Sequence, residues 1–146
     1  MASIPEGLVE RVRAVIIDSG KILLVNRVKE DESYWVIPGG KVEPNESHEK
    51  AVRRECAEEL GVEVRMSKLL LQRISDKPGT EGQQEFFYLC DIIGGRVGSG
   101  QGPEFEPGTK YEGQYRISWV DLKELRNINL KPQEVIDKIA KEYLNK

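Results

Sequence analysis

One helical pattern stands among several strand-like runs, and it limits the folds that this chain can adopt. A helix is predicted over residues 46–60, because apolar side chains recur there at intervals of four: Val52, Cys56 and Leu60. We expect Asn45 to cap its first turn and Gly61 to end it, since these residue types favour those two positions. The predicted helix is therefore amphipathic and packs one face on a core.

Strand patterns on both sides of this helix predict a sheet. Two apolar runs, one on each side of Ser19-Gly20, indicate a hairpin with a tight turn. Further strands are predicted at residues 34–37, 62–74, 84–93 and 115–120. A final helix begins near Pro132, with an apolar face formed by Val135, Ile136, Ile139, Ala140 and Tyr143. A few strands with two helices indicate one domain over residues 1–146, of the α/β or α+β class.

The charge and apolar patterns exclude several functions. The chain has 22 basic and 25 acidic residues, so binding to long nucleic acid through its phosphates is not expected. No run of 18 apolar residues is present, which argues against a membrane span, and the acidic start of the chain does not resemble a signal peptide. We therefore expect a cytoplasmic protein in which Cys56 and Cys90 are reduced core thiols.

Three glutamates on the predicted helix point to a metal ion. Glu55, Glu58 and Glu59 fall beside the apolar face rather than around the whole helix. Their mutual repulsion costs free energy, and Arg54 offsets only part of it. Mg²⁺ takes oxygen ligands and commonly lies between carboxylates and substrate phosphates, so it would relieve this repulsion. The alternative is a solvated acidic helix face, which short acidic motifs often form.

The spacing around these acids resembles the Nudix box of the Nudix hydrolase superfamily. The match covers residues 40–62 and reads Gly40, five residues, Glu46, seven residues, Arg54-Glu55, Cys56, Ala57, Glu58-Glu59, Leu60, Gly61 and Val62. The resemblance implies an α/β/α sandwich around a mixed β-sheet. It also implies metal-dependent hydrolysis of a pyrophosphate bond in a nucleoside diphosphate that is linked to another group.

The resemblance further implies a metal site on the helix. Glu55, Glu58 and Glu59 are the metal ligands that it predicts, for Mg²⁺ or for Mn²⁺ in its place. The carbonyl group of Gly39 or Gly40 is expected to join them from the preceding loop. The metal would lower the pKa of a bound water, and Glu55 is one candidate for the general base that takes its proton.

Other candidate residues surround this site. The resemblance implies an ion pair between Arg54 and Glu46 that holds the loop against the helix. An additional metal ligand is expected from the loop after residue 94. Glu112 is the first candidate there, and Glu104 and Glu106 compete with it. The alternative for each of these three is a solvated loop carboxylate.

Gly39 and Gly40 are also candidates for substrate contacts, and two further candidates precede them in the chain. Arg27 lies at the end of a predicted strand, where it either reaches a phosphate group or stays on the surface. Trp35 either stacks on a nucleobase or packs at the core or the pocket rim, as large aromatic residues usually do. His48 is the one histidine of the chain, and we expect it to be exposed and not catalytic.

The sequence says less about the substrate. A nucleoside triphosphate or a modified nucleotide ranks first, because the chain has the length of MutT-like members of the superfamily. ADP-ribose ranks second, since Pro78 lies 16 residues after Val62, as in a marker of ADP-ribose pyrophosphatases. Pro78 also fits an ordinary turn. A catalytically silent, nucleotide-binding domain is the alternative from another class, and a homodimer is left open.

Overall fold

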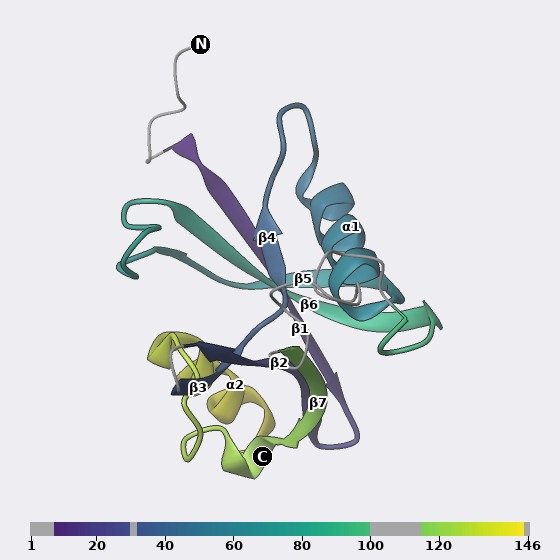
Figure 1. Cartoon of the computed structure of the whole chain (residues 1–146), viewed down its shortest axis with the longest axis vertical. Coiled ribbons are helices and arrows are strands. Elements are labelled where there is room, and N and C mark those ends of the chain that lie inside the picture. The colour runs from purple at the N-terminus through teal and green to yellow at the C-terminus, as the bar shows by residue number, and fades with distance from the viewer. Residues whose placement is uncertain (1–7, 30–31, 100–114, 145–146) are drawn as a thin grey trace.

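A seven-stranded sheet with helices on its two faces makes up the part of the chain that the structure describes. The computed structural model describes residues 8–29, 32–99 and 115–144 (Figure 1). The strands are β1 (Glu10–Asp18), β2 (Lys21–Lys29), β3 (Glu32–Val36), β4 (Gly39–Lys41), β5 (Val62–Ile74), β6 (Gln84–Gly95) and β7 (Tyr115–Asp121). The helices are α1 (His48–Leu60), the short 3₁₀-helix η3 (Leu122–Glu124) and α2 (Gln133–Tyr143). The predicted strands and both helices are confirmed, and β4 was not predicted.

The predicted N-terminal hairpin joins β1 to β2. Asp18 pairs with Lys21, and Ile17 pairs with Ile22, in an antiparallel register. Ser19 and Gly20 both have positive φ angles, of 53° and 77°. Two consecutive positive φ angles are typical of the tight turn whose twist matches that of the flanking strands.

The sheet is mixed, and its parallel pair decides which chain segments meet. Its order is β3-β2-β1-β6-β5, with β4 paired to β1 and β7 paired to β2. β1 runs parallel to β6, so Glu10 pairs with Gln84 and Arg11 with Glu85. The start of β1 therefore lies beside the start of β6 and beside the turn that connects β5 to β6.

Two hydrophobic clusters cover opposite faces of this sheet, as alternation along β1 and β2 requires. The cluster beneath α1 includes Val12, Ala14, Leu23, Val25 and the helix residues Val52, Cys56 and Leu60. The cluster beneath α2 includes Val15, Ile22, Leu24, Phe87 and the helix residues Val135, Ile136 and Ile139. Figure 1 shows the two helices on different sides of the sheet. The predicted α/β/α arrangement around a mixed sheet is confirmed.

The start of α1 differs from the prediction by two residues. Ser47 is the N-cap, and its Oγ accepts a hydrogen bond from the backbone N–H of Lys50 at 3.1 Å. Asn45 has a φ of 62° and belongs to the preceding turn, so the expectation that it caps the helix is wrong. Serine and asparagine both favour the N-cap, and the turn takes the asparagine because asparagine tolerates positive φ. Gly61 ends the helix with a φ of 78°, as predicted.

His48 is not exposed, which corrects a second expectation. Its ring is half-buried, with Nδ1 2.6 Å from Tyr88 Oη and Nε2 3.2 Å from Glu10 Oε1. The ring also meets the edge of Phe86, with 4.5 Å between centroids. The first turn of α1 lies over β1 and β6, so the sheet covers the side chain of His48. The charged residues next to His48 in the sequence had suggested an exposed position.

The remaining expectations about burial agree with the structure. Cys56 and Cys90 are buried free thiols. Val135, Ile136, Ile139 and Ala140 of α2 are buried, and Tyr143 is half-buried at the end of the same face. Among the helices in the described ranges, none has the length and apolar character that a membrane crossing requires.

Candidate active site

Glu55 lies against the backbone of β4, which explains the glycine at position 40. Its side chain is 15% exposed. A Cβ atom added to Gly40 would lie only 2.5 Å from Glu55 Oε1. Arg54 Nη1 donates a hydrogen bond to the same oxygen at 2.8 Å. Glycine therefore leaves the room in which the carboxylate is held between the strand and the arginine.

Glu59 is held from two other elements. Its Oε1 accepts a hydrogen bond from the backbone N–H of Gly39 at 3.2 Å, and its Oε2 accepts one from the hydroxyl of Tyr115 at 3.2 Å. Burial is the main reason that the pKa of Glu59 is raised, followed by the hydrogen bond and the negative charge of Glu55. Arg13 acts in the opposite direction. Two carboxylates in contact at this depth favour sharing a proton or binding a cation.

Arg54 is the centre of the ion pairs that fix this part of α1. Its Nε and Nη2 donate to the two carboxylate oxygens of Glu46 at 2.8 and 2.9 Å, and its Nη2 also donates to the carbonyl of Lys41 at 3.0 Å. The hydrogen bonds from Arg54 lower the pKa of Glu46 to about 2. The guanidinium thus joins the helix to the loop before it, in the pairing that the sequence predicted.

Glu58 is the most exposed of the three acids. Its side chain is 49% exposed, and its Oε2 lies 3.6 Å from Arg54 Nη1. Within the described residues, no three acidic, histidine or cysteine side chains already surround one cation position. Glu55 and Glu59 nonetheless fit a divalent cation, because two clustered carboxylates supply hard oxygen ligands and carry charge that a cation would compensate. Glu58 lines the same cavity as Glu55 and Glu59.

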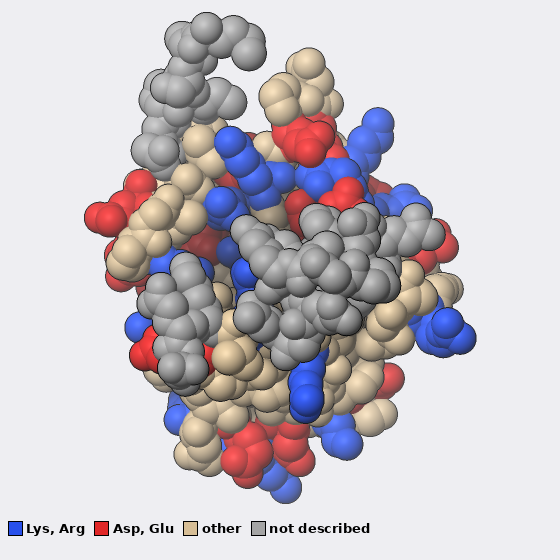
Figure 2. Space-filling model, viewed as in Figure 1, with Lys and Arg blue, Asp and Glu red and all other residues tan. Residues whose placement is uncertain are grey.

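These acids line a cavity of about 370 Å³. We call Glu55, Glu58 and Glu59 the acidic wall. The same cavity is lined by Glu85 and by four basic residues, which we call the basic wall: Arg11, Arg13, Arg27 and Lys77. Figure 2 shows basic and acidic side chains side by side in the upper half of the molecule. The cavity is therefore polar and is lined by side chains of both charges.

The basic wall comes from three elements. Arg11 and Arg13 are on β1, Arg27 is on β2, and Lys77 is on the turn between β5 and β6. Arg11 Nε donates to Gln83 Oε1 at 2.7 Å, and Arg13 Nη1 donates to the carbonyl of Ile37 at 3.2 Å. These contacts hold the two arginine side chains in place before any ligand binds.

Sequence reasoning found only part of this cavity. Of its basic residues it named Arg27, and it missed Arg11, Arg13 and Lys77. The alternating arginines at 11 and 13 were a usable signal, since residues two apart share one face of a strand. Lys77 follows an aspartate in an ordinary turn and carries no comparable signal.

The other predicted site residues have different positions. Gly39 lines the cavity. Trp35 packs against the hydrophobic cluster beneath α2 and is not among the described residues that line the cavity. Glu104, Glu106 and Glu112 lie outside the described residues. Pro78 and Gly79 form a turn in which the N–H of Thr80 donates to the carbonyl of Lys77 at 3.0 Å, so Pro78 has a local structural reason.

Both the sequence and the fold are similar to those of known proteins. The family model described as NUDIX domain matches residues 7–141. A CTP pyrophosphohydrolase of Escherichia coli is 43% identical over 89 residues, which are 60% of this chain and 66% of that protein. An 8-oxo-dGTP diphosphatase of Proteus vulgaris is 38% identical over 58 residues, which are 40% of this chain and 52% of that protein. The matches thus span between half and two thirds of these relatives.

The solved structures agree with the fold. The solution structure of the Escherichia coli ORF135 protein superposes with a TM-score of 0.66 at 26% sequence identity. The match covers 93% of this chain and 89% of that protein.

Proposed function

The chain belongs to the Nudix family, and we propose that it hydrolyses a pyrophosphate bond in a substrate that contains a nucleoside diphosphate. A nucleoside triphosphate or a modified nucleotide is the substrate that we rank first. The curated relatives support this ranking, because they are named as a CTP pyrophosphohydrolase and an 8-oxo-dGTP diphosphatase. The observation that carries the proposal is the cavity that the acidic wall and four basic residues line together.

The acidic wall is the proposed site of a divalent cation, with Mg²⁺ as the first candidate. Such an ion would neutralise phosphate charge and lower the pKa of a bound water. Glu55 and Glu59 would hold it with Glu58, and Arg54 would orient Glu55 through its hydrogen bond of 2.8 Å. Glu55 stays a candidate general base.

Around this site, the residues of the chain itself do three things. Arg54 and Glu46 hold the loop and the helix in one geometry. The N–H of Gly39 and the hydroxyl of Tyr115 orient the carboxylate of Glu59. The basic wall offers positive charge to the phosphates as they approach.

The test is a phosphate-release screen over nucleoside triphosphates, modified nucleotides, ADP-ribose and dinucleoside polyphosphates, each with Mg²⁺ and with a chelator. We expect turnover of at least one nucleoside triphosphate, and its loss when the chelator is added. Glu58→Gln should lower kcat/KM by about 10² or more, because a metal ligand is lost. Glu49→Gln is the matched control, since Glu49 lies on the same helix and is exposed.

Three outcomes would contradict parts of this proposal. Turnover that survives chelation rejects the metal. Equal effects of the Glu58 and Glu49 substitutions reject the acidic wall as the site of catalysis. Nucleotide binding without turnover of any substrate supports a catalytically silent domain instead.

A further inference from the structure

The basic wall is placed and held by the fold, although its residues are far apart in the sequence. Parallel pairing of β1 with β6 puts Arg11 beside Glu85, and it brings the β5–β6 turn next to β1. The N–H of Gln84 donates to the carbonyl of Val9 at 2.9 Å, which fixes the end of this turn against the start of β1. Lys77 therefore reaches the same cavity as the arginines of β1.

Hydrogen bonds within the β5–β6 turn hold the backbone of Lys77 in one conformation. Ser75 N–H donates to the carbonyl of Gln83 at 2.8 Å, and Gly82 N–H donates to the carbonyl of Ser75 at 2.9 Å. The hydroxyls of Ser75 and Thr80 lie 2.8 Å apart, and the Lys77 N–H donates to Ser75 Oγ at 3.2 Å. Ser75 and Gln83 are buried. Little backbone order remains to be gained when a ligand binds at this turn.

The carboxylate nearest to the basic wall is already matched by another arginine. Glu85 Oε1 accepts a hydrogen bond from Arg73 Nη1 at 2.8 Å, while Glu85 Oε2 lies 3.8 Å from Arg13 Nε. Arg73 has a side chain only 9% exposed, and it also binds Asp76 and Glu134 at 3.0 Å each. Glu85 also lines the cavity, so it offsets part of the positive charge there, but its closer partner is Arg73.

The charge at Lys77 agrees with this account. Partial burial lowers the pKa of Lys77, although its side chain keeps contact with solvent. The positive charges of Arg13, Arg27 and Arg11 lower it further, and Glu85 acts in the opposite direction. Four cations that repel one another in one cavity gain free energy when an anion joins them.

We propose that the basic wall, with Lys77 as its specificity-determining residue, binds a phosphate group of the substrate directly and without a metal ion. This inference rests on the proposed function and narrows its substrate class. A cation held by the acidic wall would neutralise the two phosphates of the bond that breaks, so the basic wall is left for a third. A nucleoside triphosphate carries this third phosphate, and ADP-ribose does not.

The experiment measures binding without metal, so that it does not depend on activity. Inorganic tripolyphosphate is titrated into the whole protein in the presence of a chelator, by isothermal titration calorimetry at low salt. We expect the wild type to bind, and Lys77→Ala to weaken binding about fivefold or more, because one direct contact with phosphate is lost. Lys77→Arg should keep most of the affinity, since it keeps the charge.

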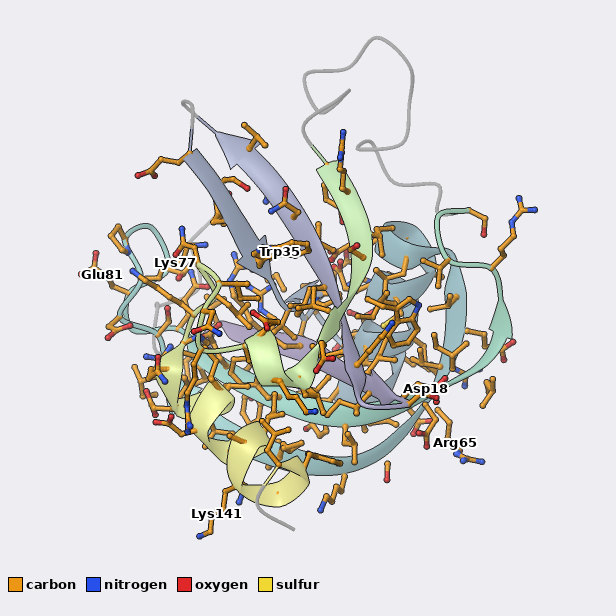
Figure 3. The ribbon with its side chains drawn as sticks, turned by 90° about the horizontal axis from the view of Figure 1, so that it is seen from below. Asp18, Trp35, Arg65, Lys77, Glu81 and Lys141 are labelled. Atoms are coloured by element: carbon orange, nitrogen blue, oxygen red, sulfur yellow. The ribbon has the colours of Figure 1, made fainter. Side chains whose placement is uncertain are left out.

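Two controls separate this site from general charge effects. Lys141→Ala makes the same change of charge on α2, and Figure 3 shows Lys141 well separated from Lys77. Arg53→Ala removes a cation from a second hollow of about 600 Å³ on the other side of Glu58. Both should leave the Kd for tripolyphosphate within about twofold of the wild type. Equal weakening by Lys77→Ala and either control, or no binding at all under chelation, overturns the inference.

Turnover distinguishes failure of this inference from failure of the proposed function. In an enzyme that hydrolyses both substrates, Lys77→Ala should raise KM for the triphosphate about fivefold and raise KM for ADP-ribose by less than about twofold. Equal effects on both substrates overturn the inference and leave the hydrolase intact. Binding of tripolyphosphate that depends on Lys77, without turnover of any nucleotide, keeps the inference and rejects the hydrolase.

Discussion

The acidic wall and the basic wall differ in how the chain builds them. Glu55, Glu58 and Glu59 come from adjacent turns of one helix, so their relative positions follow from helical geometry alone. The basic wall comes from β1, β2 and the β5–β6 turn, and its members meet only when distant strands pair. One wall is thus a local motif and the other is a product of topology. The comparison teaches that a sequence motif places neighbouring side chains by local geometry, while the residues that line the rest of the cavity depend on strand pairing.

The largest loss of activity is expected from a substitution in β4, the strand against which Glu55 of the acidic wall lies. Gly40→Ala places a Cβ atom 2.5 Å from Glu55 Oε1, so the carboxylate must move. We expect kcat/KM to fall by about 10², because a metal ligand displaced by this much loses its geometry. Steady-state kinetics measures the loss, and circular dichroism checks that the fold is kept.

Gly94→Ala is the control for this substitution. Its Cβ atom would meet only the end of the Glu63 side chain at 3.2 Å, which can move aside. If Gly40→Ala keeps full activity, Glu55 is not held where the metal site needs it.

The ion pair between Arg54 and Glu46 predicts that Glu46→Gln lowers the free energy of unfolding by an amount that depends on pH. Arg54 holds the pKa of Glu46 at about 2, below its ordinary value of 4.5. Ionised Glu46 therefore stabilises the fold fully above pH 4.5, and this stabilisation is lost as the pH falls toward 2. We expect Glu46→Gln to lower the free energy of unfolding by roughly 1–2 kcal/mol at pH 7 and to lower kcat/KM about tenfold.

Urea unfolding at pH 7 and at pH 3 measures the effect on stability. The difference between wild type and Glu46→Gln should be smaller at pH 3. Glu49→Gln, on the exposed side of α1, should show little difference at either pH. A difference that is constant between the two pH values would contradict the role of the Glu46 charge.

Tyr115 links the acidic wall to β7, and its loss should have a smaller effect. Its hydroxyl donates to Glu59 Oε2 at 3.2 Å. Tyr115→Phe should raise the Mg²⁺ concentration for half-maximal activity about threefold, because one hydrogen bond that orients the carboxylate is lost. Tyr143→Phe on α2 makes the same chemical change away from the cavity. An unchanged Mg²⁺ dependence in Tyr115→Phe would show that Gly39 and burial suffice to hold Glu59.

The smallest effect is expected when a residue of the acidic wall is changed and binding at the basic wall is measured. Glu58→Gln should leave metal-free binding of tripolyphosphate within about twofold of the wild type, and any change should be toward tighter binding. The reason is that a negative charge is removed while the basic wall stays intact. Weaker binding in this variant, measured by calorimetry under chelation, would mean that the anion does not sit at the basic wall.

Most of the secondary structure was predictable from the sequence, since it depends on local patterns. Apolar residues at helical spacing identified α1 and α2, and the Ser19-Gly20 turn identified the hairpin. One error was local: Asn45 and Ser47 both suit an N-cap, and no sequence pattern chooses between them. The other error was not local. The environment of His48 was missed because its partners are 38 and 40 residues away.

The sequence by itself determined the acidic wall and its helix, because the α-helix fixes which residues share a side. The Arg54–Glu46 pair followed from the resemblance to the Nudix box, since Glu46 lies before α1. Only the tertiary structure decided the basic wall, since the parallel register of β1 with β6 joins segments about 70 residues apart, and no local pattern encodes that register. The same pairing brought Lys77 to the cavity that Glu59 lines and so made one cavity of the two walls.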